Sequence, residues 1–357
     1  MKIGFLSCSA LALLLFQACG GEAKPAAPTQ NPTPTPAPAA KSDPATQESV
    51  TAKKPTAPVR VDMVMAKQLF SMAPAAPAVD NPSTPEKVAL GNALYHDKSL
   101  SKNGNISCAS CHDLANYGQD GKPTSPGTDG KNGERNTPTV WNASRQFVQF
   151  WDGRAATVEE QAIGPVLNPV EHGITDEKEL LAKLNAKPEL VAAFAKAFPG
   201  ADSVSVKNFQ NAIGAFERTL VTRSKFEDVL DGKAQLTNDE KLGLKTFLEV
   251  GCQACHMGSM LGGSMYQKIG VVKPYASTDE GRAALTKSDA DKFLFKVPSL
   301  LNVEKTAPYY HDGKIATLEE AVSNMAEIQL GKTLKAEEVA AVVAFLKTLT
   351  GPLPALK

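Results

Sequence analysis

The sequence predicts a mostly α-helical fold of two related domains, preceded by a disordered tether. Apolar residues recur at three- and four-residue spacing over residues 176–194, 205–221 and 336–349, which is the pattern of amphipathic helices. A break is expected near Pro188, because proline lacks the N–H that continues a helix. Long alternating patterns typical of strands do not occur, and a segment that is repeated later in the chain predicts the two domains.

Length and composition limit the possible functions. The chain has 357 residues and 42% hydrophobic residues, which is enough for two modest domains. Its 38 basic and 38 acidic residues cancel, so the charge indicates no nucleic-acid partner. Glycine- and proline-rich stretches at 118–133 and 257–277 are expected to form loops.

Residues 1–19 have the layout of a secretory signal peptide. Lys2 is followed by an apolar run from Ala10 to Phe16, which is too short to span a bilayer. The end of this segment, Leu15-Phe16-Gln17-Ala18-Cys19, resembles the lipobox of bacterial lipoproteins, in which the cysteine is lipidated. We therefore expect a periplasmic protein anchored to a membrane only through Cys19; ordinary signal cleavage nearby is the alternative.

Residues 20–58 are expected to be a disordered linker. The segment is rich in alanine, proline and threonine and has almost no large apolar side chains. Such a composition cannot bury enough surface to offset the loss of chain entropy on folding. The linker would hold the folded domains away from the membrane.

Four of the six cysteines lie in two C-x-x-C-H motifs, the signature of c-type haem attachment. Two thiols three residues apart can add to the two vinyl groups of one porphyrin, and the adjacent histidine then reaches the iron from the same face. The sequence therefore predicts two covalently bound haem c groups. The residues are Cys108, Cys111 and His112 in the first motif, and Cys252, Cys255 and His256 in the second.

Two other interpretations of the cysteines are weaker. A four-cysteine zinc site would leave both histidines unexplained. A thioredoxin-like dithiol needs neither the histidines nor a second copy of the motif.

The stretch around each motif occurs twice, which predicts two cytochrome c-like domains related by internal duplication. We place the first domain at residues 59–221 and the second at 222–351, and expect the tail 352–357 to pack back on the first. The parallel segments are Glu86-Lys87-Val88-Ala89-Leu90-Gly91 and Glu240-Lys241-Leu242-Gly243, Thr137-Pro138-Thr139-Val140-Trp141-Asn142 and Val297-Pro298-Ser299-Leu300-Leu301-Asn302, and Trp151-Asp152-Gly153-Arg154 and His311-Asp312-Gly313-Lys314.

The repeats differ where an iron would need its second axial ligand. Met325 follows His311 by fourteen residues, and the aligned residue of the first repeat is Pro165. Methionine ligation raises the potential of a haem and closes its sixth position, as in an electron-transfer centre; the alternative is that Met325 only fills the core.

The first repeat offers polar side chains in place of the methionine. Gln161 aligns with Ala321, and Glu171 follows in the segment Asn168-Pro169-Val170-Glu171-His172. A carboxylate can move a proton between the two oxygens of a peroxide, and an amide can orient them. The alternative is that Glu171 and Gln161 are solvated residues at the ends of helices.

These residues resemble the bacterial dihaem cytochrome c peroxidases, a family that includes the methylamine-utilisation dihaem enzymes. The resemblance covers about residues 79–353. Its most specific segments are Cys108-Ala109-Ser110-Cys111-His112-Asp113-Leu114, Gln149-Phe150-Trp151-Asp152-Gly153-Arg154-Ala155, Gly164-Pro165-Val166-Leu167-Asn168-Pro169-Val170-Glu171 and Gln329-Leu330-Gly331-Lys332.

The resemblance implies a division of labour between the haems. The N-terminal haem would be the low-potential peroxidatic centre, with Glu171 and Gln161 as its distal acid–base and positioning groups. The C-terminal haem would receive the electrons, with Met325 as its distal ligand, and Trp151 would lie on the electron path between the two. His311 aligns with Trp151 and is expected to contact the second haem without ligating its iron.

The resemblance also implies a calcium ion between the domains. Asn136, Thr306 and Pro308 occupy the positions that supply its oxygen ligands in the family. Members of the family commonly form homodimers.

One departure from the family concerns the loop after the first motif. Many members cap the oxidised peroxidatic haem with a histidine of this loop, but the matching residue here is Thr128, and no histidine lies between His112 and His172. We hypothesise that this haem is open or water-bound when oxidised. His96 and His172 are the remaining candidates for a cap, although His96 is better explained by packing or a propionate contact.

The leading hypothesis is a cytochrome-c peroxidase that reduces hydrogen peroxide to water. Its electrons would come from a small c-type cytochrome or a cupredoxin. One rival is a dihaem enzyme that oxidises a protein substrate; in those relatives a tyrosine ligates the second haem, whereas Met325 keeps the methionine spacing here. The other rival is a pure electron-transfer cytochrome, in which Glu171 and Gln161 would have no task.

Overall fold

A computed structural model describes residues 58–72 and 80–355 of the chain. The expected signal peptide, its Cys19 and all but the last residue of the expected linker 20–58 lie outside the described residues. Within the described part, no helix is both long and apolar enough to cross a membrane.

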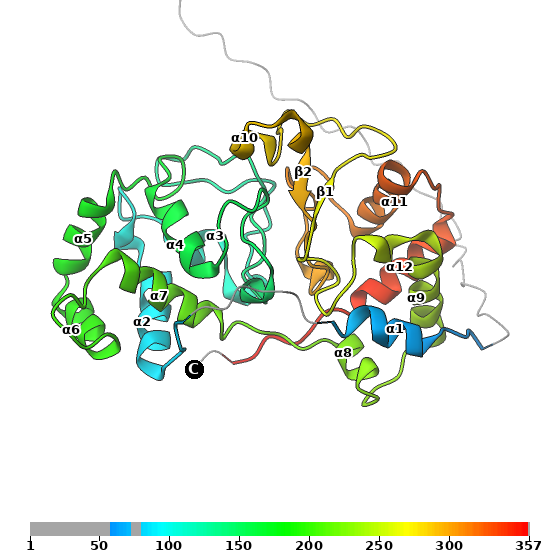
Figure 1. The fold of residues 1–357 in the computed structure, drawn as a ribbon, viewed down its shortest axis with the longest axis horizontal. Coiled ribbons are helices and arrows are strands. Elements are labelled where there is room, and N and C mark those ends of the chain that lie inside the picture. Colours follow the sequence, from blue (N-terminus) through cyan, green and yellow to red (C-terminus); the bar gives the residue numbers. More distant parts are fainter. Residues whose placement is uncertain (1–57, 73–79, 356–357) are drawn as a thin grey trace, which may run out of the picture. The chain divides into compact units, whose positions relative to one another are not determined.

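The described chain is mostly helical, which confirms this part of the predicted fold class (Figure 1). Short 3₁₀ turns and loops connect the helices, and the single sheet has two strands. The helices up to residue 217 are α1 (Met63–Phe70), α2 (Pro85–His96), α3 (Cys108–Cys111), α4 (Val158–Leu167), α5 (Glu177–Asn185), α6 (Pro188–Ala197) and α7 (Val206–Glu217). The later elements are α8 (Lys225–Leu230), α9 (Asn238–Val250), β1 (Tyr266–Lys268), α10 (Ala283–Thr286), β2 (Leu294–Lys296), α11 (Leu318–Leu330) and α12 (Ala336–Lys347).

Local sequence signals explain where the helices begin. The carboxylate of Asp176 accepts a 2.9 Å hydrogen bond from the N–H of Glu179 and so caps α5. The expected break near Pro188 occurs, since α5 ends at Asn185 and Pro188 opens α6. The expected loop at 257–277 is wrong in one part, because it contains β1, which pairs antiparallel with β2. Three residues are too short a run for alternation to show in a sequence.

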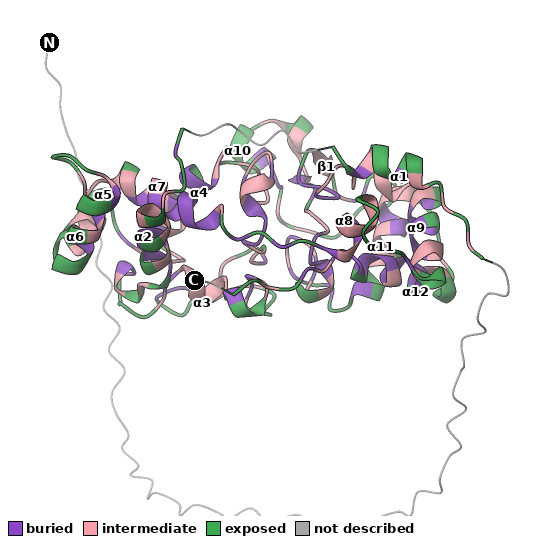
Figure 2. Cartoon of the chain, turned by 90° about the horizontal axis from the view of Figure 1, so that it is seen from below, coloured by how far each residue is buried: buried purple, intermediate pink, exposed green. Residues whose placement is uncertain are grey.

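One hydrophobic core lies between α2, α4, α5, α6 and α7. Its largest fully buried side chains include Trp141, Tyr95 and Phe209. Figure 2 shows α7 largely buried, whereas α5 and α6 expose much of their surface. Leu353 from the end of the chain also packs against this core, the place expected for the tail 352–357.

A second hydrophobic core is formed by α9, α11 and α12 with α8. The helix α1 belongs to it as well, since Ala66 and Phe70 are fully buried there and the ring of Phe70 lies 5.6 Å from that of Phe226. Our boundary, which placed residues from 59 onward in the first domain, is therefore corrected for α1. This helix buries its two apolar residues against the later half of the chain.

The same helix crossing occurs in both cores. In the first, Gly91 of α2 lies so close to α7 that a Cβ atom would overlap the carbonyl oxygen of Ala212. In the second, Gly243 of α9 has the same relation to the carbonyl of Ala341 in α12. Glycine is required at both crossings because only hydrogen fits between the backbones.

Thr222 joins equivalent positions of the two repeats. Asn142 and Asn302 both adopt a left-handed backbone conformation, with φ of 63° and 62°. The side-chain amide of each donates a 2.9 Å hydrogen bond to the hydroxyl oxygen of Thr222. All three side chains are buried, so this shared oxygen is a fixed link between the halves.

Two backbone hydrogen bonds connect the halves in a reciprocal way. The N–H of Asn136 donates to the carbonyl of His311 at 2.7 Å, and the N–H of Lys296 donates to the carbonyl of Trp151 at 2.7 Å. Asn136 aligns with Lys296, and Trp151 aligns with His311. In each repeat, the N–H group at this position therefore donates to a carbonyl group of the other repeat.

Two candidate haem sites

The first C-x-x-C-H motif forms the short helix α3. His112 follows it, and its ring Nδ1 lies 3.0 Å from the carbonyl oxygen of Pro138 and 3.3 Å from that of Gly118. Burial lowers the pKa of His112, which favours the neutral imidazole that ligates a metal. Nδ1 is thus held by backbone carbonyls, and Nε2 is left for an iron.

The second motif begins with the 3₁₀ turn Cys252–Ala254, which follows α9 after the left-handed Gly251. His256 is oriented as His112 is: its Nδ1 lies 3.0 Å from the carbonyl oxygen of Leu261, and burial lowers its pKa. Both motifs therefore present a neutral, fixed imidazole.

A cavity adjoins the second motif. Cys252, Cys255 and His256 line it, and Met325 of α11 lines the same cavity. Most of the other lining side chains are apolar, among them Phe247, Leu300, Val342 and Leu346. A mostly apolar cavity lined by two thiols, an oriented imidazole and a thioether fits a haem c with histidine and methionine ligands.

The thiols do not have the properties of a zinc or dithiol site. Cys108 packs against the first core and Cys252 against the second, so the four cysteines do not converge on one ion. Within residues 58–72 and 80–355, no three His, Cys, Asp or Glu side chains are grouped as a metal site requires. Burial raises the pKa of Cys108 to about 12 and that of Cys252 to about 11, whereas the cysteines of reactive dithiols have lowered pKa values.

Glu171 lies in the turn after α4, close to the first motif. Its carboxylate is near enough to Cys108 and Cys111 to raise the pKa of both thiols. Burial raises the pKa of Glu171 itself, while Arg154 and a 2.7 Å hydrogen bond from the amide of Asn168 to Oε1 oppose the rise. The structure thus brings a partly buried carboxyl group to the first haem site.

Gln161 lies on α4, the helix that leads to this turn. It is half-buried, and within the described part of the chain no hydrogen bond holds its side-chain amide. Both residues are half-buried, and their roles at the first haem site stay a prediction.

Thr128 docks its loop on the turn that carries Glu171. Its N–H donates to the carbonyl of Glu171 at 2.8 Å, and its hydroxyl donates to Oδ1 of Asn105 at 2.8 Å. The side chain is 3% exposed. The residue that matches the family's capping histidine is thus fixed by its own polar contacts.

The two unassigned histidines differ in their surroundings. His96 is exposed at the end of α2, with Nδ1 3.0 Å from the carbonyl of Asn92. His172 is buried, with Nδ1 3.0 Å from the carbonyl of Leu100, and burial lowers its pKa. His172 is therefore shielded from solvent, whereas His96 is not.

Trp151 lies where the two halves meet. Its indole N–H donates to the carbonyl of Asn136 at 2.9 Å, and its ring lies edge-on to His311 at 6.4 Å between centroids. Both residues line the second cavity. Nε2 of His311 is 2.9 Å from the hydroxyl of Ser277, so this imidazole is held beside the cavity as expected.

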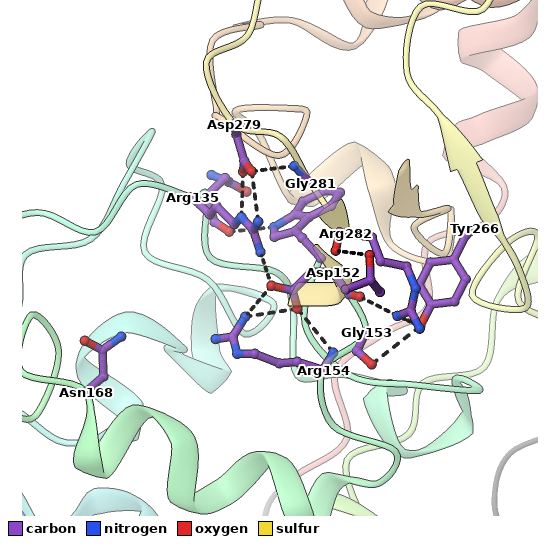
Figure 3. A network of polar contacts seen from close by, with 12 residues as sticks. Arg135, Asp152, Gly153, Arg154, Asn168, Tyr266, Asp279, Gly281 and Arg282 are labelled. Carbon is purple, nitrogen blue, oxygen red and sulfur yellow. Dashed lines mark hydrogen bonds and ion pairs between the residues drawn. The ribbon is translucent and has the colours of Figure 1, made fainter. Parts of the chain in front are cut away.

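Sequence reasoning missed the ion-pair network around Asp152 (Figure 3). Arg135 donates to Asp152 at 2.7 Å and to Asp279 at 2.6 and 2.9 Å, so one guanidinium joins carboxylates of both halves. Arg154 also bonds Asp152 at 3.0 Å, and Arg282 donates to the backbone carbonyl of Asp152 at 3.0 Å. The Asp-Gly pair that follows Trp151 and recurs in the second repeat was the sequence feature that could have pointed to Asp152.

The three residues expected to bind calcium do not share a hydrogen-bond partner. The amide of Asn136 donates to the carbonyls of Lys122 and Pro123, at 3.0 and 3.3 Å. Thr306 and Pro308 flank Ala307, and no hydrogen bond joins them to Asn136. The calcium site stays a prediction.

Comparisons with known proteins agree on one family. The family model described as "Di-haem cytochrome c peroxidase" matches residues 85–235. A cytochrome c551 peroxidase of Nitrosomonas europaea is 46% identical over 282 residues, covering 77% of this chain and 83% of that protein. The cytochrome c551 peroxidase of Pseudomonas aeruginosa is 44% identical, with 76% and 81% covered. A solved structure of a MauG-like protein associated with microbial copper homeostasis aligns with a TM-score of 0.70 at 30% identity, covering 78% of this chain and 93% of that one.

Proposed function

The chain belongs to the di-haem cytochrome c peroxidase family, and from this premise we propose that it reduces hydrogen peroxide to water at the haem held by His112. The family carries haem c, so Cys108, Cys111 and His112 would hold one group, and Cys252, Cys255 and His256 the other. Haem at the first site supplies an iron that accepts single electrons and binds peroxide.

One observation carries the proposal: the two sites differ in what lies beside the histidine. Met325 lines the cavity of His256, whereas a carboxyl group with a raised pKa lies close to the first motif. Methionine as the distal ligand suits electron transfer, and an iron beside a carboxyl group suits peroxide chemistry.

Glu171 moves the proton in this proposal. Asn168 occupies Oε1, which leaves Oε2 to accept a proton from one peroxide oxygen and return it to the other. Burial raises the pKa of Glu171, so the carboxyl group exchanges protons more readily near neutral pH than an exposed glutamate does. The side-chain amide of Gln161 has no hydrogen-bond partner among the described residues, and it would orient the peroxide.

Electrons would enter at the second haem and reach the first by way of Trp151. Trp151 lines the second cavity while its own segment belongs to the first repeat. The donor would be a small c-type cytochrome or a cupredoxin that delivers one electron at a time.

We further propose that no loop histidine caps the peroxidatic haem. Thr128 replaces that histidine, and its hydrogen bonds to Asn105 and Glu171 support a loop that stays docked beside the site. His96 is exposed, and Nδ1 of His172 is engaged by Leu100. The oxidised enzyme would then react with peroxide without prior reduction.

The remaining features also belong to the proposal. The recurring glycine crossings and the reciprocal hydrogen bonds between the halves support an internal duplication. Residues 1–19 and the linker to residue 58 would place the enzyme in the periplasm, lipid-anchored through Cys19. A calcium ion at Asn136, Thr306 and Pro308 and a homodimer would follow the family.

The experiment is EPR of the oxidised holoprotein, followed by addition of peroxide and of reduced cytochrome c. We expect one high-spin and one low-spin haem, a change of the Soret band within seconds of adding peroxide, and consumption of the reduced cytochrome. Two low-spin haems would refute the open site. If the Soret band does not change when peroxide is added, the pure electron-transfer protein is favoured. If the protein reacts with peroxide but does not consume a reduced small donor, an enzyme that acts on a protein substrate is favoured.

A further inference from the structure

Glu217, the last residue of α7, has a buried carboxyl group for which the proposed peroxide chemistry has no use. The residue is 5% exposed, and within residues 58–72 and 80–355 no group donates a hydrogen bond to its side chain. Burying a carboxyl group without such a bond costs folding free energy. The packing of the core therefore does not explain a glutamate at this position.

The two helix crossings show which space Glu217 faces. Gly91 packs on Ala212 and Phe216 of α7, as Gly243 packs on Ala341 and Phe345 of α12. These contacts align Ala215-Phe216-Glu217-Arg218-Thr219-Leu220 with Ala344-Phe345-Leu346-Lys347-Thr348-Leu349.

Glu217 therefore corresponds to Leu346, which lines the cavity beside His256 and Met325. The same packing predicts that the carboxyl group of Glu217 faces the first haem site. An apolar side chain in one repeat is replaced by an ionisable one in the other.

The residue before Glu217 lies close to the first motif: the ring of Phe216 is 5.3 Å from that of Tyr95, whose hydroxyl donates to the carbonyl of His112 at 2.6 Å. The negative charge of Glu217 raises the pKa of Cys108 in α3 and of Tyr95 in α2. Burial raises the pKa of Glu217 to about 8; Glu159 of α4 adds to the rise and Arg218 opposes it. Arg218 forms an ion pair with Glu159, and no ion pair joins Glu217 to another residue in the described part of the chain.

We infer that Glu217 lowers the reduction potential of the first haem and takes up a proton when that haem is reduced. The inference rests on the proposed attachment of haem at Cys108. On reduction, the iron gains one electron from the second haem, and the carboxylate of Glu217 gains one proton from solvent. The charge of the buried site then stays constant, whereas Leu346 gives the second haem no such group.

The test is a spectroelectrochemical titration of both haems at several pH values in the neutral and mildly alkaline range, with dithionite as reductant. The potential of the first haem should fall by up to about 59 mV per pH unit, the value for a tenfold change per unit and one electron. Glu217→Gln and Glu217→Leu should remove this slope and raise the potential of the first haem at the alkaline end of the range. The leucine variant carries the residue found at the aligned position of the second repeat. The potential of the second haem should not change.

Glu189→Gln is the matched control, because this exposed glutamate lies on α6 of the same core and loses the same charge. It should leave both potentials as in the wild type. A Glu217→Gln protein that holds both haems and keeps the wild-type slope would overturn the inference while leaving the proposed function intact. A wild-type protein without covalent haem at Cys108, measured by pyridine haemochrome and mass spectrometry, would overturn both.

Discussion

The backbone N–H of Lys296 donates a 2.7 Å hydrogen bond to the carbonyl oxygen of Trp151. Lys296 ends β2 in the second half of the chain, so the tryptophan of the first repeat is fixed against the second haem cavity that it also lines. The indole N–H is engaged by Asn136 as well, at 2.9 Å. Trp151 is thus held at both its backbone and its side chain where the two sites meet.

Replacing Trp151 with phenylalanine should slow electron transfer between the haems. The backbone bond to Lys296 survives this change, whereas the indole and its bond to Asn136 are lost. Stopped-flow spectroscopy of the half-reduced protein mixed with peroxide measures the rate. Unchanged transfer at unchanged potentials would remove Trp151 from the electron path.

Glu171→Gln should lower kcat about 10²- to 10⁴-fold, the usual contribution of a general acid–base group, and leave the haem content intact. Proton transfer from peroxide needs the ionised carboxylate, so kcat/KM should fall as the pH drops through the pKa of Glu171. Because burial raises that pKa, the acid limb should lie above the range of an exposed glutamate and should vanish in the variant. Glu177→Gln, on the exposed face of α5, is the control; turnover that survives in Glu171→Gln would refute the assignment.

Met325→Ala should lower the potential of the second haem, because methionine ligation raises it. The charge-transfer absorption of methionine-ligated ferric haem c should disappear with the side chain. Met260→Leu serves as the control, since Met260 is fully buried in the same core but does not line the cavity, and a volume-conserving change of this kind costs less than about 1.5 kcal/mol. If both variants keep the absorption band, Met325 only fills the core.

Gly91→Ala should destabilise the protein by at least about 1–3 kcal/mol, the usual cost of overpacking. The new methyl group would overlap the backbone of Ala212, which cannot move without shifting α7. Urea unfolding of the holoprotein measures the loss. Gly133→Ala, where a Cβ meets nothing within 4 Å, should leave the unfolding midpoint in place; equal effects of the two substitutions would contradict the close crossing.

The attachment motifs and the mostly helical fold could be predicted because each follows from local rules. Covalent haem chemistry requires Cys-x-x-Cys-His, and amphipathic spacing shows in a single stretch of sequence. The orientation and the neutral state of His112 and His256 could not be predicted. The orientation depends on carbonyl groups outside the motifs, and the lowered pKa depends on burial.

Features that join distant parts of the chain were missed. The eight residues of α1 show an apolar face but not which core it meets, and so its assignment to the first domain was wrong. Arg135 and Asp279 pair across the two repeats without any pattern in the sequence. Glu217 resembles an ordinary charged residue at a helix end until the glycine crossing aligns it with Leu346.

The hydroxyl oxygen of Thr222 accepts as many hydrogen bonds as it can. An oxygen of this kind has two lone pairs, and the amides of Asn142 and Asn302 take both. A shift of either asparagine relative to the other must strain or release a bond on the opposite side. This oxygen therefore couples the positions of the two asparagines, and a third donor could bind to it only by displacing one of them.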